Sequence, residues 1–595
     1  MGNLMASFNA GVSGLHSAQA SLNTTSHNLA NAQTKGYTRQ QVIVTDSFYQ
    51  NTLGNHDNLL QTGTGTTIVT TRQVRNEFLD EQYRLQVGRQ SFYEANQKAV
   101  YEIEDMMGEL EGEQFQASIV SLKNALSSLA ADPSDIVYKD ELVSVASQFI
   151  ERAQVLKEQL DEYQTSLNTE VRNQVDAINN YVEEIRYLNK QIQKFEATGE
   201  SANDYRDKRN QYLDELSKII NFSTTEERDG TIMIYSEGAY LLDSSTQYYL
   251  TVDYESDTSK LLKPVWESGG DYFQSDSLEF STEQNTDVGS LRGIMVARGN
   301  YSANYANVPS KPVDDDYRDA DGVLDTKAYN QAMIQYREDI KTYNETIGAS
   351  AVMTIQSQLD TLIHGIVTQV NDVLCPNKEI TLSDGTTITV LDEEKALVGD
   401  DENNTIGAEL FSRRNCKRYE KSTVKVLNGD GDEESLEVYI YNPENKEDKY
   451  SLYTIEQLVV NPIVLQDSST IPTMYSKDSE TPNAYAYNEI GSIAASFDND
   501  IGTLNPNSMT TYNVYNYYGA MIGEMSVTGN VWNGIIANQE LTVTSLETER
   551  QNVMGVSSDE ELSDLIKFQR CYDASSRYIT TISEMLEYLI EKLGG

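Results

Sequence analysis

A chain of 595 residues with 92 acidic and 45 basic side chains carries a formal charge of −47, and its length corresponds to about four domain-sized units. So acidic a chain is a poor candidate for binding nucleic acid or an anionic membrane, because both require a basic surface. No stretch approaches the roughly 18 apolar residues of a membrane span, and we expect neither a cleaved signal peptide nor a disulfide framework, since the three cysteines are widely spaced.

The first thirty residues form a predicted helix that lacks charge. Residues 1–45 contain no Asp or Glu, and Lys35 and Arg39 are the only charged side chains before Asp46. Because its outer face lacks charge, we expect this helix to pack against other elements on several sides, with small residues that allow close approach. Steps of three and four residues mark one apolar stripe on it, at Met5, Phe8, Val12, Leu15, Leu22 and Leu29.

The helix leads into the stretch SHNLANAQTKGYTRQ, whose residues suit a helix end and a turn. Gly36 can adopt the left-handed conformation that ends a helix or turns the chain. Asn28 and Asn31 can bond the carbonyl groups that a helix end leaves unsatisfied. Arg39 offers a planar, bidentate donor group to a carboxylate on a neighbouring element.

The middle of the chain alternates between helical and β-rich segments. Apolar periodicity predicts helices over about 75–108, 114–130, 138–195 and 352–373. Strands are predicted within 223–287, with a hairpin turn at Glu237-Gly238, and within 376–504, with hairpin turns at Asp384-Gly385 and near 429–432. Residues 301–345 form an expected insertion with one charged helix, and the helical pattern returns from Thr511 onward.

The C-terminal thirty residues carry the strongest periodic pattern in the chain. Their heptad stripe runs through Leu565, Phe568, Tyr572, Ile579, Ile582, Leu586 and Leu589. One stripe cannot bury itself, because a lone helix has no partner surface. We therefore expect the two terminal helices to pair and the rest of the chain to lie outside that pair.

Patterns of catalytic and ligand-binding sites are missing from the sequence. The four histidines show no metal-ligand spacing, no Gly-Lys dipeptide is present for a P-loop, and no GxSxG motif occurs. Two acidic loops, around Asp319 and around Asp430, resemble fragments of calcium loops but lack a closing acid or the turn glycine. We predict no catalytic, cofactor or metal site.

The two ends of the chain together resemble the bacterial flagellar axial proteins of rod, hook and hook–filament junction. The N-terminal match lies at Asn28, Asn31, Thr34, Gly36, Tyr37 and Arg39. The ending GYTRQ, the segment NDYRDKRNQYLDELSKIINF and the C-terminal helix are most similar to the hook-associated protein 1 family within that group. The resemblance covers about residues 1–250 and 510–595, and it is weak between them.

This resemblance implies an α+β multidomain fold in three layers. Terminal heptad helices would form a coiled-coil inner layer, followed outward by a helix-rich middle domain and an inserted outer β domain. The expected divisions are 1–64 with 546–595 for the inner layer, 65–375 with 505–545 for the middle domain including a β portion near 223–300, and 376–504 for the outer domain.

The resemblance also implies a function and a set of partners. The chain would be a structural subunit of the hook–filament junction, exported without a cleaved signal peptide and located outside the cell. Its expected partners are further copies of itself, hook protein, a second junction protein, and an export chaperone that binds the C-terminal region. The alternatives are another axial protein (hook or distal junction), a secreted enzyme with its chemistry in 376–504, or a coiled-coil adhesin.

Overall fold

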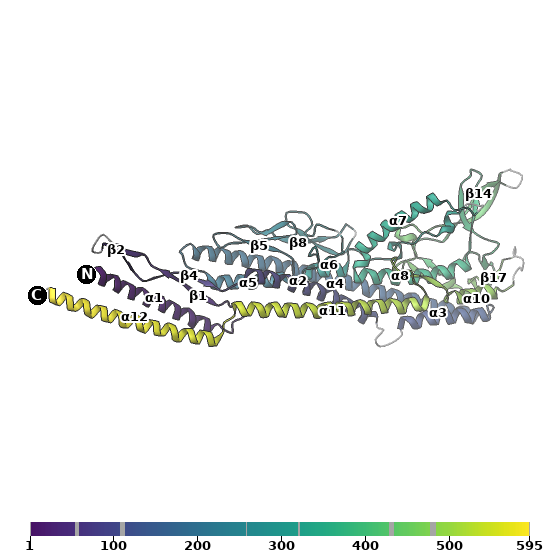
Figure 1. The fold of residues 1–595 in the computed structure, drawn as a ribbon. Coiled ribbons are helices and arrows are strands. Elements are labelled where there is room, and N and C mark those ends of the chain that lie inside the picture. The colour runs from purple at the N-terminus through teal and green to yellow at the C-terminus, as the bar shows by residue number, and fades with distance from the viewer. Residues whose placement is uncertain are drawn as a thin grey trace.

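The computed structural model is an elongated molecule in which both chain termini lie at the same end (Figure 1). It describes residues 2–53, 59–107, 114–257, 259–275, 277–318, 322–427, 433–476 and 484–593. The expected calcium-like loops fall at 319–321 and 428–432 and therefore lie outside the described residues.

Five helices make up the shaft of the molecule: α2 (Glu77–Met107), α3 (Gln114–Ala131), α4 (Ile136–Glu196), α8 (Ala351–Leu374) and α11 (Val514–Met554). Of these, α4 is the longest, with 61 residues. Its start is set by Asp135, whose side chain accepts a hydrogen bond from the Val137 N–H as an N-cap. The predicted stripe through Val171, Val175 and Ile178 is buried along it, as its spacing requires. The helices predicted over these ranges are confirmed.

Shorter elements flank the shaft near its middle. The helices are α5 (Asn203–Ser217) and α6 (Ser290–Arg298), and the strands are β5 (Ser223–Glu226), β6 (Ile232–Ser236), β7 (Ala239–Leu242), β8 (Leu250–Tyr254) and β9 (Leu262–Trp266). Strands β5, β6 and β7 form one antiparallel sheet, and β8 pairs with β9. The predicted hairpin turn is confirmed, because Glu237 and Gly238 between β6 and β7 both have positive φ angles, of 46° and 81°.

The end of the molecule opposite the termini contains most of the remaining strands (Figure 1). A four-stranded sheet has the order β10-β11-β15-β14, from β10 (Asn377–Thr381), β11 (Thr387–Leu391), β14 (Tyr419–Leu427) and β15 (Glu433–Tyr441). Smaller pairs are β12 (Leu397–Val398) with β17 (Met474–Tyr475), β13 (Phe411–Arg413) with β16 (Leu458–Val460), and β18 (Asp500–Thr503) with β19 (Thr511–Asn513). The helices there are α7 (Thr326–Glu345), α9 (Pro462–Gln466) and α10 (Tyr487–Ser496).

Residues 376–504 do not have a hydrophobic core of their own. Buried side chains of this segment, including Phe411, Tyr453 and Phe497, belong to one apolar cluster with α3, α4, α8 and α11. Phe411 also packs against Phe149 of α4, with ring centroids 6.3 Å apart. The β-rich sequence pattern correctly predicted strands here. The buried faces of these strands pack against helices of the shaft, and the four-stranded sheet is the part that stands clear of the shaft.

Two further expected boundaries fall inside continuous structure. The division at 545/546 lies within α11, which continues unbroken to Met554. The division at 64/65 lies inside a two-stranded ribbon in which β1 (Gln40–Asp46) pairs with β4 (Thr66–Gln73) and β2 (Tyr49–Leu53) pairs with β3 (Leu59–Gly63). The ribbon follows α1 (Gly2–Ala30), and the chain ends in α12 (Ser558–Leu593). We call α1, the ribbon and α12 the terminal unit, and the described residues 77–554 the body.

The apolar cores of the body stop short of the terminal unit. Three clusters of buried apolar side chains are present in the described chain, and their buried members lie between Phe92 and Met525. The terminal unit is therefore held to the body by other means.

Candidate assembly site at the paired termini

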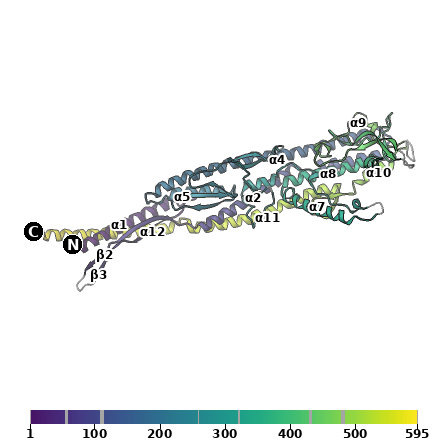
Figure 2. The same ribbon diagram turned by 90° about the horizontal axis from the view of Figure 1, so that it is seen from above.

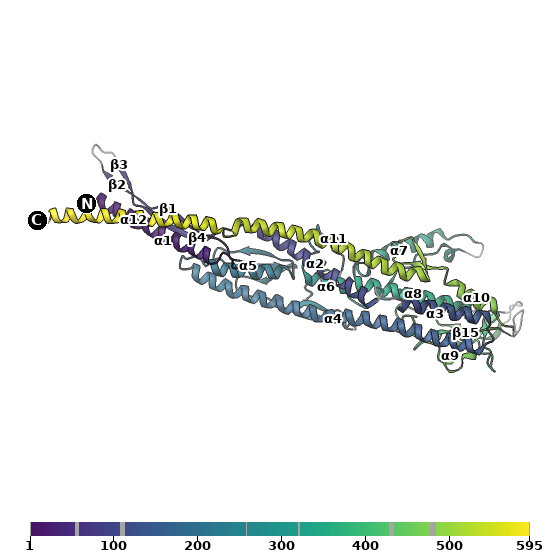
Figure 3. The same cartoon turned by 90° about the horizontal axis from the view of Figure 1, so that it is seen from below.

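The two terminal helices pack against each other in antiparallel orientation (Figures 1 and 3). Gly11 of α1 lies beside Ile579 of α12, and Gly14 lies beside Ser575. A Cβ atom added at Gly11 would lie 2.9 Å from the Ile579 Cγ1 atom, so a larger residue there would force the helices apart. The expected pairing of the two ends is present within one chain.

The side of α1 that meets α12 differs from the expected stripe. Buried positions follow steps of three and four residues but are occupied by small or short polar residues: Gly11, Ala18, Ser21, Thr25 and Asn28. The predicted apolar positions, each one residue later, are only half-buried at Phe8, Val12, Leu15, Leu22 and Leu29, and Met5 is 51% exposed. Small side chains let the two helix axes approach closely, and the branched and aromatic side chains lie beside the contact.

The predicted stripe of α12 faces α1. Ile582 is 6% exposed, and Leu589, near the end of the stripe, is 37% exposed. The other predicted members are half-buried: Leu565, Phe568, Tyr572, Ile579 and Leu586. Further apolar side chains of α12 lie outside the stripe and are exposed: Tyr578, Met585, Tyr588 and Ile590. The helix pair thus leaves apolar side chains of both helices uncovered.

Asn28 joins the end of α1 to the ribbon and to α12. Its Oδ1 atom accepts hydrogen bonds from the Tyr37 hydroxyl at 2.8 Å and from the Gln40 N–H at 3.0 Å. Its Nδ2 atom donates to the Gln40 carbonyl at 2.9 Å and to Glu561 Oε2 at 3.1 Å. Asn28 is 1% exposed, so both ends of its amide are satisfied inside the structure. The sequence suggested that Asn28 bonds the carbonyl groups at the end of its own helix, but its amide bonds the ribbon and α12 instead.

Arg39 binds the first turn of α12, as its predicted role required. Its Nε atom donates to Glu561 Oε1 at 2.7 Å, and its terminal nitrogens lie 3.3 Å from Glu560 and 3.8 Å from Asp564. The Glu561 carboxylate is 2% exposed and is held by Asn28 as well as by Arg39. Sequence reasoning did not single out Glu561; the available signal was the acidic first turn of the C-terminal helix.

The rest of the N-terminal motif forms the turn between α1 and the ribbon. Asn31 donates to the His27 carbonyl at 3.0 Å, and the Thr34 hydroxyl donates to Asn31 Oδ1 at 3.3 Å. Gly36 has a φ angle of +77°, and a Cβ atom there would clash with the Gln211 side chain. Burial, and then Asp204, Asp207 and Glu561, raise the pKa of the Tyr37 hydroxyl, which stays protonated and donates to Asn28.

A polar joint connects the ribbon to α5. The buried Asp207 carboxylate accepts hydrogen bonds from the Thr38 N–H at 3.1 Å and from Gln73 Nε2 at 2.6 Å. Gln73 also donates to the Asn203 carbonyl, and the Asn203 amide donates to the Thr71 carbonyl. Burial raises the pKa of Asp207 to about 6. These contacts are hydrogen bonds rather than apolar packing.

A buried ion-pair network fixes the last turn of α11 to α2 and α5. Arg550, 4% exposed, donates to Asp80 Oδ1 at 2.8 Å and to Asp214 Oδ2 at 2.9 Å. Arg75 also pairs with Asp80, and Arg84 pairs with Asp214 at 2.7 Å. Burial raises the pKa of Asp214, but Arg84 and Arg550 together hold it below its ordinary value. Sequence reasoning missed this network, because nothing in a single sequence links positions so far apart.

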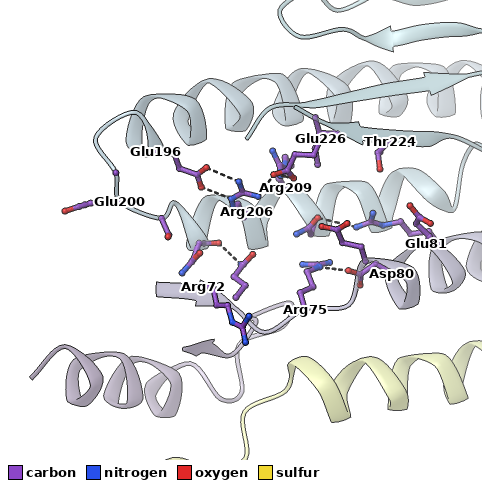
Figure 4. Close-up of a pocket in the computed structure, with 18 residues that line it drawn as sticks. Arg72, Arg75, Asp80, Glu81, Glu196, Glu200, Arg206, Arg209, Thr224 and Glu226 are labelled. Atoms are coloured by element: carbon purple, nitrogen blue, oxygen red, sulfur yellow. Dashed lines mark hydrogen bonds and ion pairs between the residues drawn. The ribbon is translucent and has the colours of Figure 1, made fainter. Parts of the chain in front are cut away.

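A charged cleft of about 510 Å³ lies next to this network, between the ribbon, α2, α5 and β5 (Figure 4). Four of its five arginines already have carboxylate partners, and Arg72 donates to the Gln41 side-chain oxygen. Arg206 pairs with Glu196 and with Glu226 at 2.7 Å each, and Arg209 pairs with Glu226 at 2.9 Å. Burial lowers the pKa of Arg209 to about 10, which leaves it charged at neutral pH. A cleft whose charges are mutually neutralised is suited to holding the joint together rather than to binding an anion.

The described residues contain neither a candidate metal site nor a candidate membrane span. No group of three or more His, Cys, Asp or Glu side chains there is arranged to hold a metal ion. Within the same residues, no helix has the length and apolar content needed to span a bilayer.

Comparison with known families matches three segments of the chain. Residues 100–387 match the model of the flagellar hook-associated protein FlgK helical domain. Residues 8–38 match the flagella basal body rod protein model, and residues 550–592 match the C-terminal model of the flagellar basal body rod FlgEFG proteins. The two terminal matches coincide with α1 with its turn and with α12.

Several curated relatives are similar to this chain over nearly its full length. Flagellar hook-associated protein 1 of Bacillus subtilis is 22% identical over 98% of this chain and 96% of the relative. The proteins of the same name from Salmonella typhimurium (22% identical) and Escherichia coli (23% identical) also cover 98% of this chain. The solved structure of the flagellar hook junction protein FlgK from Burkholderia pseudomallei aligns with 80% of this chain and 100% of its own, at 12% identity and a TM-score of 0.47.

The family model of the helical body, the two terminal models and the full-length relatives all agree. In its helical body, in its two terminal segments and over nearly its full length, the chain is similar to flagellar hook-associated protein 1 and related flagellar proteins.

Proposed function

We propose that this protein is a structural subunit of the bacterial flagellum that forms the junction between hook and filament. Copies assemble head-to-tail through the paired α1 and α12 helices, which make the inner layer of a tube. The observation that carries the proposal is the helix pair itself, which joins the two chain ends but leaves apolar side chains of both helices uncovered.

Two uncovered apolar surfaces on this pair are suited to contacts between copies. On α1, Phe8, Val12 and Leu15 lie beside the α12 contact and remain half-exposed. On α12, Tyr588 and Ile590 are 61% and 67% exposed. Because Gly11 lies beside Ile579 and the helices are antiparallel, these last residues of α12 extend beyond the first turn of α1. Neighbouring copies can cover both surfaces, which one chain alone cannot.

The arrangement of the remaining elements supports a layered subunit. The body forms the layer around the inner tube, and the four-stranded sheet at the far end from the termini faces outward (Figure 1). The joint at Asp207 holds the terminal unit at a fixed place on the body, and the network of Arg550, Asp80 and Asp214 fixes the end of α11, which leads into α12. The motif residues Asn28 and Arg39 thereby act in assembly by positioning α1 against α12.

The proposal includes partners and an export route. Hook protein would lie on one side of the subunit and a second junction protein on the other, and an export chaperone would bind the C-terminal region before assembly. The subunit would leave the cell without a cleaved signal peptide and function outside it. Its role is structural rather than catalytic, and the charged cleft of the described residues, in which four of five arginines are paired with carboxylates, supports that view.

Hook protein and the distal junction protein are the second candidates. The relatives named hook-associated protein 1 align over 96% to 99% of their own length, which favours the first junction protein.

Electron microscopy of cells that lack the gene tests the proposal. We expect hooks without filaments, and filaments restored by the wild-type gene on a plasmid. Normal filaments in the mutant would contradict any role at the junction, and basal bodies without hooks would place the protein below the junction.

A further inference from the structure

The outer face of α11 differs from the exposed side of α4, the longest helix of the body. Between Asn516 and Thr548, a length of about 50 Å at 1.5 Å per residue, Glu540 is the one charged residue at an exposed position. Three large apolar side chains on this face are well exposed: Val527 at 62%, Val531 at 54% and Leu541 at 71%. They follow helical spacing and share one side of the helix with Gly519, Gly523 and Gly534.

The opposite side of α11 is fully used by the body. Tyr517, Met521 and Met525 are buried in the main apolar cluster, and Trp532 packs on Tyr93 of α2 with ring centroids 5.5 Å apart. The outer face therefore takes no part in packing within one chain.

The matching surface of α4 shows what a solvated helix looks like in this protein. Helices α4 and α11 lie along opposite edges of the body in two views (Figures 2 and 3). The exposed side of α4 carries charge along most of its length, for example at Glu151, Glu158, Glu162, Arg172, Asp176 and Glu184. Charge is the ordinary outer surface of a helix in so acidic a chain, and α11 lacks it.

The glycines of the α11 face serve no packing purpose in the monomer. A Cβ atom added at Gly519, Gly523 or Gly534 would meet nothing within 4 Å. Each glycine lowers helix stability relative to alanine, so the isolated chain gains nothing from them. The hydroxyls of Thr542 and Thr548 on the same face donate to carbonyls of their own helix, which presents their methyl groups outward. Such a surface permits close approach of another backbone.

We propose that this face of α11 is a contact surface for the body of a second copy of the same chain. The inference rests on the proposed function and extends it from the terminal helices to the body. Net charge favours a second copy as the partner at this face. Two chains of charge −47 repel each other, and they can pack closely where neither presents acidic side chains. The helix α11 also leads through residues 555–557 into α12, which packs against the uncharged α1.

Charge insertion with a matched control tests the contact. Val531→Glu adds an acid to the α11 face, and Val155→Glu adds one to the exposed side of α4, where the native side chain is 45% exposed. Both side chains are exposed, so we expect an unchanged thermal midpoint for both purified variants and wild-type amounts of both in the culture medium. Antibody labelling at hook tips should be lost for Val531→Glu and retained for Val155→Glu. Equal labelling of the two variants, or a lowered midpoint for Val531→Glu, would overturn the proposal.

Two further measurements identify the occupant and separate this inference from the proposed function. A photoreactive residue at Val527 should yield an adduct of two copies of this chain in isolated junctions, and an adduct with a different protein or no adduct would exclude a second copy. Ile582→Asp, in the terminal pair, should abolish labelling through the terminal contacts alone. Normal labelling with Ile582→Asp would refute the proposed function, whereas loss with Ile582→Asp and normal labelling with Val531→Glu would refute only the α11 contact.

Discussion

The terminal unit and the body are built on different packing principles. The body buries many large apolar side chains, such as Phe149, Phe411 and Tyr517, in continuous clusters. Of the described large apolar side chains in α1 and α12, Ile582 is the one that is fully buried. Burial of one Leu, Ile or Phe contributes about 1.5–3 kcal/mol, so the body can fold alone and the helix pair gains little from its own core.

The difference indicates that the two parts of the molecule have different roles. The body supplies stability, and the terminal pair supplies surfaces that become buried in the assembled structure. A helix pair with a seam of glycine, alanine, serine and threonine gains close approach rather than buried apolar area, and its polar anchor, Asn28 with Glu561, sets its geometry. The following changes should separate the two parts.

The largest effect is expected from removing residues 376–504. This deletion takes Phe411, Tyr453 and Phe497 out of the main cluster, so the body should fail to fold. Circular dichroism and the absence of a cooperative thermal transition would show it. The contrasting variant replaces residues 424–436 of the β14–β15 hairpin by Asn-Gly, which closes the cross-strand pair Thr423–Glu437 with a two-residue turn. It should fold with a nearly unchanged midpoint, and a cooperative fold of the full deletion would contradict the shared core.

Replacing Arg550 by Met should have the next largest effect. The change leaves Asp80 and Asp214 buried with one arginine partner fewer each, and losing a partner of a buried ion pair costs about 3 kcal/mol or more. Urea denaturation measures the loss in the free energy of unfolding. Arg228→Met, at an exposed position, is the control and should change it by less than about 0.5 kcal/mol. Equal stability of the two variants would mean that the network does not hold α11 to α2 and α5.

Replacing Asn28 by Ala should affect the terminal unit alone. The change leaves the Gln40 backbone groups and the Glu561 carboxylate without one buried partner each, at about 1–3 kcal/mol. Hydrogen exchange of residues 2–40 and of the first turns of α12 should become faster, while exchange in α4 and α8 stays unchanged. Asn23→Ala, on the exposed side of α1, is the control and should leave all regions unchanged. Faster exchange throughout the body would show that the two parts unfold together.

The joint at Asp207 should give a small pH dependence. Burial raises the folded-state pKa of this carboxyl from 3.8 to about 6, so its contribution to stability is present below about pH 4 and is lost as the pH rises through 6. Comparison of unfolding free energies between the wild type and Asp207→Asn cancels the other groups. The difference, wild type minus variant, should fall between pH 4 and 6 and be flat above pH 7. A difference that rises with pH would mean that the hydrogen bonds from Thr38 and Gln73 outweigh burial.

The body helices and the stripe of α12 were predictable from the sequence. Their buried residues are apolar and recur at helical spacing, as at Val171, Val175 and Ile178, and local periodicity reports burial wherever a core is apolar. Apolar periodicity predicted the α12-facing side of α1 one residue too late. The contact there is made by small residues, which a hydrophobicity pattern does not detect. The Gly11 contact with Ile579 depends on size rather than on polarity.

Long-range polar partners were beyond the reach of one sequence. Arg39 was correctly expected to bind a carboxylate, but its partner, Glu561, lies more than five hundred residues away. The partners of Arg550 on α2 and α5 lie 470 and 336 residues away. The β-rich segment 376–504 failed as a separate domain for a related reason: alternation identifies a strand with one buried face but does not tell whether a sheet or a helix covers that face.

The substitution Ile582→Asp, measured in two assays, tests the central claim most directly. It places a charge at the most buried large apolar side chain among the described residues of the terminal pair, so the pair should separate, while the apolar clusters of the body contain no residue from α12. The account predicts that the main thermal midpoint of the purified monomer is unchanged, that the variant is exported, and that it is absent from hook tips, with Glu584→Ala on the exposed side of α12 behaving as the wild type. A main midpoint lowered by several degrees, or normal incorporation at hook tips, would contradict it.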